Sequence, residues 1–104
     1  SLKAVLSQRL IRKLCLKCHG KGSDSENLKC KTCAGTGFKG RSGIFEMLSI
    51  NEEIASAISK SCDSATLFNL ARKKGMKTIM EDGMEKVRNG VTTEAEIARV
   101  TINV

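Results

Sequence analysis

The chain has 104 residues, with 18 Lys and Arg against 11 Asp and Glu, and a formal net charge of +7. This length allows one small domain, and the 40% of hydrophobic residues argue against global disorder. No stretch approaches the ~20 apolar residues of a membrane span, so we expect no direct membrane span. Phe is the only type of aromatic residue, which makes a stacking platform for single-stranded nucleic acid hard to build. We therefore expect no nucleic acid partner.

Apolar residues near the N-terminus recur at intervals of three and four, at Leu2, Val5, Leu6, Leu10 and Leu14. That spacing places them on one face of an amphipathic helix. The pattern predicts a helix over residues 2–14.

Residues 15–43 lose this periodicity and contain six of the nine glycines. The basic surplus lies in the same part of the chain, because residues 1–42 hold ten Lys or Arg and only two acidic residues. We predict a loop region that obtains its order from something other than an apolar core.

Four cysteines in this region form two Cys-x-x-Cys pairs separated by eleven residues. Each pair can offer two thiolates to one tetrahedral ion, and the second pair closes the coordination shell. We predict a structural Zn²⁺ site with the ligands Cys15, Cys18, Cys30 and Cys33. The interleaved lysines offset the negative charge of four thiolates around one divalent ion; they are Lys17, Lys29 and Lys31. The alternative for these lysines is contact with nucleic acid, in a zinc-dependent nucleic-acid binder.

Other interpretations of these cysteines stay open at this point. A disulfide pair is disfavoured because the N-terminus lacks the apolar core of a secretory signal, while iron suits the same four ligands. Cys15 to His19 also matches the attachment pattern of c-type haem, but the second pair has no following His and a haem needs a large apolar pocket. We expect His19 to be an exposed neighbour of the metal and Cys62 to be a lone structural thiol.

The segment Gly35-Thr-Gly-Phe-Lys-Gly40 fits a dinucleotide-binding fingerprint and, through Ser42, nearly fits a Walker A loop. Both motifs need a preceding strand and a following helix, and Arg41 stands where a P-loop has lysine. We interpret these glycines as tight turns after the second cysteine pair.

Residues 43–50 predict a short strand, in which Ile44, Met47 and Leu48 are candidates for burial. Three or four short helices follow. Their expected N-caps are Asn51, either Asp63 or Ser64, and Thr93. Their expected stop signals are Gly75 and Asn89-Gly90. Thr93 with Glu96 predicts a capping box, and Gly83 inside the third helix predicts close packing.

The expected fold is mainly α (a small α+β domain), a bundle of short helices with a zinc knuckle and a short strand or hairpin segment. Along the chain we expect a helix at 2–14, a tetracysteine zinc-binding loop at 15–43, and a short strand and helical subdomain at 44–104. The acidic pair Glu81-Asp82 is interpreted as solvated, and no catalytic residues are predicted because the chain has one His and suggests no triad.

Two resemblances follow from these motifs. Residues 15–22 (CLKCHGKG) and 30–37 (CKTCAGTG) both fit C-x-x-C-x-G-x-G, which resembles the cysteine-rich zinc region of DnaJ-type co-chaperones. This likeness covers residues 15–37 alone, and it implies an alternative function as a zinc module that binds polypeptide.

The second resemblance covers nearly the whole chain. AVLSQRLIRKLC at 4–15, the paired Cys-x-x-Cys, TGFKGRSGIFEML at 36–48 and GMKTIMEDGMEKVRNGVTTEAEIARV at 75–100 appear in that order. Together they resemble the C-terminal domain of the type II secretion and type IV pilus assembly ATPases, and GRSGIFE is the most characteristic motif. In that family the tetracysteine segment binds zinc.

This resemblance implies a parent protein that is a cytoplasmic hexameric motor, peripheral to the inner membrane through its partners. The parent would hydrolyse ATP with Mg²⁺ at Walker motifs upstream of Ser1, so the chain alone is not expected to be an ATPase. The implied partners are the remainder of the parent ATPase, neighbouring subunits and inner-membrane secretion or pilus components. Candidate contact residues are Arg9, Arg12 and Arg41, for which a solvated helix face is the alternative.

Overall fold

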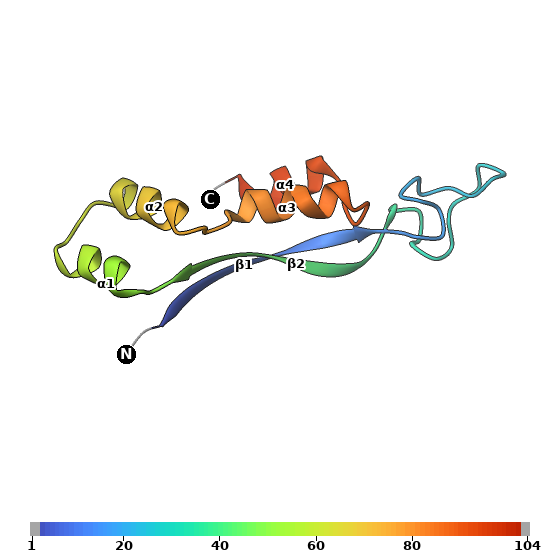
Figure 1. Ribbon diagram of the computed structural model, residues 1–104. Coiled ribbons are helices and arrows are strands. Elements are labelled where there is room, and N and C mark those ends of the chain that lie inside the picture. Colours follow the sequence, from blue (N-terminus) through green and yellow to red (C-terminus); the bar gives the residue numbers. More distant parts are fainter. Residues whose placement is uncertain (1–2, 103–104) are drawn as a thin grey trace.

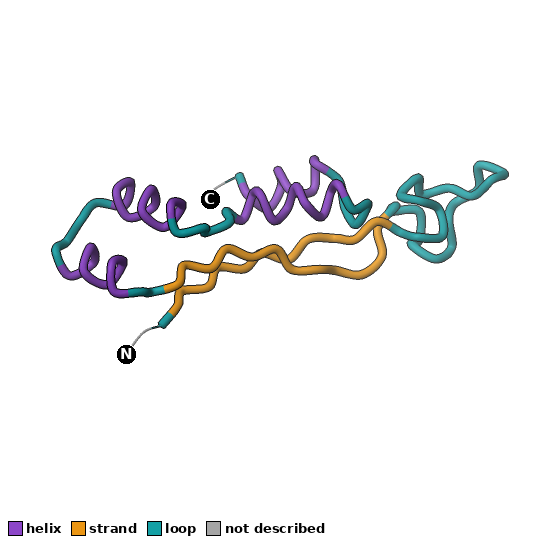
Figure 2. The backbone as a smooth tube through the Cα atoms, viewed as in Figure 1, coloured by secondary structure: helices purple, strands orange, loops and turns teal. Residues whose placement is uncertain are grey.

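The computed structural model describes residues 3–102 and shows an elongated molecule of 62 × 23 × 20 Å (Figure 1). A two-stranded antiparallel sheet runs through it, helices line one side, and an irregular lobe projects from one end of the sheet (Figure 2). No helix among the described residues has the length and apolar character needed to cross a membrane.

The first strand, β1 (Ala4–Leu14), replaces the helix predicted over residues 2–14, so that prediction is wrong. Leu2 lies outside the described residues. The leucines at positions 6, 10 and 14 are four residues apart, and a spacing of four places them on one face of a strand as readily as on one face of a helix. The partner strand decides between the two, because it pairs with the backbone of β1 from Ala4 to Leu14.

That partner is β2 (Phe38–Ser49), which confirms the strand expected at 43–50 and begins earlier. The two strands pair in antiparallel register from Ala4 opposite Ser49 to Leu14 opposite Phe38, with one irregularity at Lys13. The predicted loop region of 15–43 is therefore shorter, and the irregular lobe occupies residues 15–37.

The four helices begin close to the expected positions. They are α1 (Glu52–Ser59), α2 (Ser64–Lys73), α3 (Ile79–Arg88) and α4 (Glu94–Thr101). The side chains of Asn51, Asp63 and Thr93 each accept the backbone N–H three residues on, which confirms these N-caps. The third helix has Thr78 as its N-cap, and Thr78 and Glu81 form a reciprocal capping box there.

The core lies between the sheet and the last two helices. Ile11 of β1, Ile44 of β2, Ile79 of α3 and Ile97 of α4 are buried against one another. Gly83 confirms its predicted close packing, since a Cβ there would lie 2.9 Å from the Cδ1 of Ile97. Four helices with a two-stranded sheet agree with a small α+β domain, whereas the sheet is longer than the short segment expected in a mainly α bundle.

Helix carboxylates bind the outer edges of both strands. The N–H of Phe45 in β2 donates to Asp82 of α3 at 2.8 Å, and the N–H of Arg12 in β1 donates to Glu96 of α4 at 2.7 Å. Asp82 is therefore not part of a simple solvated pair, as the sequence suggested, but satisfies a backbone donor that would otherwise be free at a sheet edge. These bonds hold α3 and α4 over one face of the sheet.

Candidate metal centre

The lobe consists of two loops of the same design. The first runs from Cys15 to Gly22 and the second from Cys30 to Gly37, and their residues of positive φ lie at corresponding positions. The residue after the second cysteine of each pair has a positive φ, 55° at His19 and 56° at Ala34, and a glycine with φ of 81° follows in both loops. The repeated C-x-x-C-x-G-x-G pattern is thus expressed as two equivalent turns.

The two loops bind each other through their ends. Cys15 N–H donates to the carbonyl of Gly37 at 2.8 Å, and Cys30 N–H donates to the carbonyl of Gly22 at 2.9 Å. Their glycines are needed for this approach, because a Cβ at Gly22 would lie 2.6 Å from the carbonyl oxygen of Gly35, and one at Gly37 would lie 2.6 Å from that of Gly20. The reciprocal contacts bring both cysteine pairs to the same point.

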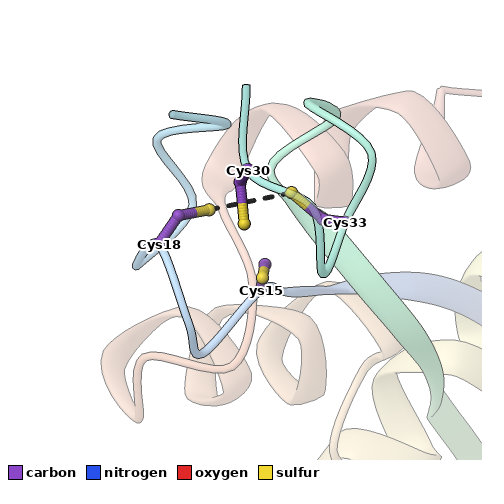
Figure 3. A group of neighbouring side chains, drawn as sticks. All are labelled: Cys15, Cys18, Cys30 and Cys33. Atoms are coloured by element: carbon purple, nitrogen blue, oxygen red, sulfur yellow. Dashed lines mark hydrogen bonds between the residues drawn. The ribbon is translucent and has the colours of Figure 1, made fainter. Parts of the chain in front are cut away.

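All four predicted ligands meet at this point (Figure 3). The sulfur atoms of Cys15, Cys18, Cys30 and Cys33 lie within 4.8 Å of one another, and all four residues are buried. The Sγ atoms of Cys18 and Cys33 are 3.7 Å apart. Two thiolates on one tetrahedral ion with metal–sulfur bonds of about 2.3 Å lie roughly 3.8 Å apart. The four residues therefore suit a tetrahedral metal ion in both donor type and spacing.

Backbone donors point at the sulfur atoms. Gly22 N–H donates to Cys18 and Gly37 N–H donates to Cys33, each at 3.2 Å. Burial alone raises the pKa of the Cys33 thiol, but the bond from Gly37 and those with the Cys30 and Cys18 side chains outweigh it and lower that pKa from 9.0 to about 6. These contacts favour a thiolate, which is the form that binds a metal.

Other residues that the sequence singled out lie apart from this cluster. All five cysteines are free thiols, and Cys62 is outside the group. His19 is exposed and does not join the sulfur atoms, as expected. Gly40 lies inside β2, so the glycine segment lacks the strand–loop–helix context of a nucleotide site.

No pattern in the sequence indicates the ion-pair network near the end of the sheet from which the lobe projects. Glu96, expected to complete a capping box with Thr93, is buried and binds Arg12 and Arg99 instead. From the sequence, Arg12 is predicted only as a candidate subunit contact. No local pattern joins two residues 84 positions apart, so only the tertiary fold reveals the pair. Arg9 and Arg41, the other two candidates, are exposed strand residues.

Comparison with known proteins places these features in a family. The sequence model of the family described as type II/IV secretion system protein matches residues 1–99. A relative from Thermus thermophilus, type IV pilus assembly ATPase PilB, is 37% identical over 98% of this chain and 14% of its own length.

Two further relatives agree. Type II secretion system protein HxcR of Pseudomonas aeruginosa is 37% identical over 97% of the chain and 22% of its own length. Protein transport protein HofB homolog of Escherichia coli is 34% identical over 96% of the chain and 25% of its own length.

The chain thus spans between 14% and 25% of the length of these three relatives. The co-chaperone likeness depends on residues 15–37 alone, whereas the family match includes those residues and extends through both strands and most of α4. This chain belongs to the type II/IV secretion system protein family.

Proposed function

We propose that this chain is the C-terminal, zinc-binding domain of a hexameric cytoplasmic ATPase that powers type II protein secretion or type IV pilus assembly. In this proposal the domain has a structural and interaction role. ATP and Mg²⁺ bind to a part of the parent protein upstream of these residues.

One observation carries the metal part of the proposal. Within residues 15–37, all of which are described, the only buried side chains are those of the four cysteines. A segment without an apolar core needs another source of stability, and a metal bound to four thiolates supplies one. Four thiolates leave no open position for substrate, which favours structural Zn²⁺ over a catalytic ion.

The names of the relatives support the motor part of the proposal. Two of the three relatives are named for type II secretion or type IV pilus assembly, and the latter is named an ATPase. By analogy, the partners of this domain are the remainder of the parent ATPase, a neighbouring subunit of the hexamer and inner-membrane components of the secretion or pilus machinery. The parent would then lie on the cytoplasmic side, peripheral to the inner membrane.

Metal analysis of the purified chain tests the site. We expect elemental mass spectrometry to find one Zn²⁺ per chain. In the native protein a thiol-reactive reagent should modify a single cysteine, Cys62. Cys30→Ser should lose the metal, whereas the matched control Cys62→Ser should retain it. Iron in place of zinc would contradict the proposed identity of the ion. Reaction of all four cluster thiols with the reagent in the native protein would contradict the metal site itself.

The Cys30→Ser variant also tests the role of the metal. Amide hydrogen exchange should become fast in residues 15–40, while far-UV circular dichroism keeps the signal of the C-terminal helices. If the helical signal collapses together with the lobe, the metal is not confined to a local structural role.

ATP hydrolysis tests the motor. The complete parent protein should hydrolyse ATP when Mg²⁺ is present and form hexamers, and the 104-residue chain should do neither. A parent that is inactive with all nucleotides would contradict the proposal, even if its zinc content is as expected.

A further inference from the structure

The face of the sheet opposite α3 and α4 carries apolar side chains that are about half exposed. Met47 of β2 lies opposite Leu6 of β1, and Phe45 and Leu10 continue the row along the same face. The Phe45 ring lies over Gly43, which pairs with Leu10, and the polar Gln8 lies opposite Phe45 on the same face. We call Leu6, Leu10, Phe45 and Met47 the outer face, and between 41% and 59% of each residue is exposed.

The opposite face shows what a covered face of this sheet looks like. Ile11 and Ile44 on that side are completely buried beneath α3 and α4. The carboxylates of Asp82 and Glu96 also fix both helices to the strand edges. These two helices are therefore held on the inner side of the sheet, and neither of them covers the outer face.

The shape of the molecule points the same way. Its radius of gyration is 18.4 Å, whereas a compact domain of about 100 residues has roughly 13 Å. Four large apolar side chains gathered on one face of the sheet, with Gln8 among them, indicate an interaction surface rather than singly scattered exposed residues.

The length of the relatives indicates what the occupant is. Each of the three contains between four and seven times as much polypeptide as the matched segment. We infer that the outer face is the surface on which an apolar part of the same polypeptide, outside these 104 residues, packs. This inference rests on the proposed function, in which the chain is one domain of a longer ATPase, and it assigns the surface that joins the domain to the rest.

Oxidation of two methionines by dilute hydrogen peroxide tests this inference. Met47 lies on the outer face and is 53% exposed, and Met80 on α3 is 45% exposed and is the matched control. Mass spectrometry follows both rates in the 104-residue chain and in the complete parent, with N-acetylmethionine added to measure the oxidant. In the chain both should oxidise at similar rates, and in the parent the Met47 rate should fall at least tenfold more than the Met80 rate.

A Met47 rate that is the same in both proteins, or that falls no more than the Met80 rate, would overturn the inference. A different result is that Met47 in the isolated chain becomes better protected as the protein concentration rises, while sedimentation equilibrium gives the mass of a dimer. That result would overturn the inference in favour of a second copy of the chain. If the parent protects Met47 but does not hydrolyse ATP, the packing surface is supported and the proposed motor function is contradicted. The failure of one proposal is therefore distinguishable from the failure of the other.

Leu6→Asp gives a second, independent measurement. Leu6 is exposed in the chain, so the midpoint of thermal unfolding of the isolated chain should change by no more than that of Ile58→Asp, a matched exposed control on α1. In the parent, Leu6→Asp alone should lower the midpoint markedly or leave the protein insoluble. Equal effects of both substitutions in the parent would count against a packed outer face.

Discussion

Arg12 binds the buried carboxylate of Glu96 through both its backbone and its side chain. Its N–H donates to Oε2 at 2.7 Å, and its Nε and Nη2 donate to Oε1 at 3.2 and 3.0 Å. Arg99 donates two further bonds at 2.8 Å, and the Arg12 guanidinium lies 4.2 Å from the centre of the Phe38 ring. This one carboxylate therefore ties α4 to the end of the sheet from which the cysteine lobe projects.

Replacing that carboxylate should destabilise the fold without affecting the metal. Glu96→Gln removes the negative charge between two arginines, and because both arginines reach solvent we expect a loss of about 2 kcal/mol in the free energy of unfolding. Urea denaturation measures the loss. Glu94→Gln on the same helix is an exposed control and should change stability by less than about 0.5 kcal/mol. An equal loss for the two variants would mean that the network contributes nothing.

The same carboxylate predicts a pH dependence of stability. Hydrogen bonds from Arg99, opposed by burial and reinforced by Arg12, lower the pKa of Glu96 from 4.5 to about 2. Because the folded pKa is below the unfolded one, this contribution is complete above about pH 4.5 and is lost as the pH falls toward 2. The Thr78 backbone and Arg72 lower the pKa of Glu81 to about 2 as well, so its effect has the same sign.

Denaturation at a series of pH values measures this dependence. The decline between pH 4.5 and 2 should be shallower in Glu96→Gln than in the unchanged protein. Parallel curves for the two proteins would show that Glu96 is not the titrating group.

The glycines of the cysteine loops should be sensitive to a single methyl group. At Gly37 a Cβ would lie 2.6 Å from the carbonyl oxygen of Gly20, whereas at Gly90, which also has a positive φ, nothing lies within 4 Å. Gly37→Ala should weaken zinc affinity by at least tenfold because it forces the two loops apart, and Gly90→Ala should leave affinity unchanged. Competition with a chromophoric chelator measures both, and equal affinities would contradict the packing of the loops.

In α3, we predict that Gly83 gives a more stable protein than alanine would, although glycine has the lower helix propensity. Alanine would gain about 1 kcal/mol of propensity, but its Cβ would lie 2.9 Å from both the Cδ1 and the Cγ2 of Ile97. We expect Gly83→Ala to lower the free energy of unfolding by about 1–2 kcal/mol. Adding Ile97→Val, which removes Cδ1, should relieve part of that strain in a double-mutant cycle. A more stable Gly83→Ala protein would show that α3 and α4 can separate without cost.

The parts of the fold that local chemistry controls were predictable. Asn51, Asp63 and Thr93 are caps because their side chains satisfy nearby backbone donors, and such short-range bonds are visible in sequence. The cysteine cluster was equally visible, since two Cys-x-x-Cys pairs have few other ways to bring four thiols together.

The strand β1 was not predictable in the same way. Its apolar residues fit a helix, and its actual partner lies beyond the entire cysteine lobe, from Phe38 onward. The Arg12–Glu96 pair has the same origin, because a contact across 84 positions depends on the sheet already being formed. In both cases tertiary pairing determined the outcome and local spacing did not.

The lobe leaves and rejoins the sheet at a single rung, where Leu14 pairs with Phe38. An excursion whose two ends are neighbours can be lengthened, shortened or excised without shifting the register of the strands that carry it. A two-residue turn that replaces residues 15–37 and joins Leu14 to Phe38 should therefore keep the sheet and its helices intact. Changes in the size of the lobe during evolution would for the same reason leave the rest of the domain undisturbed.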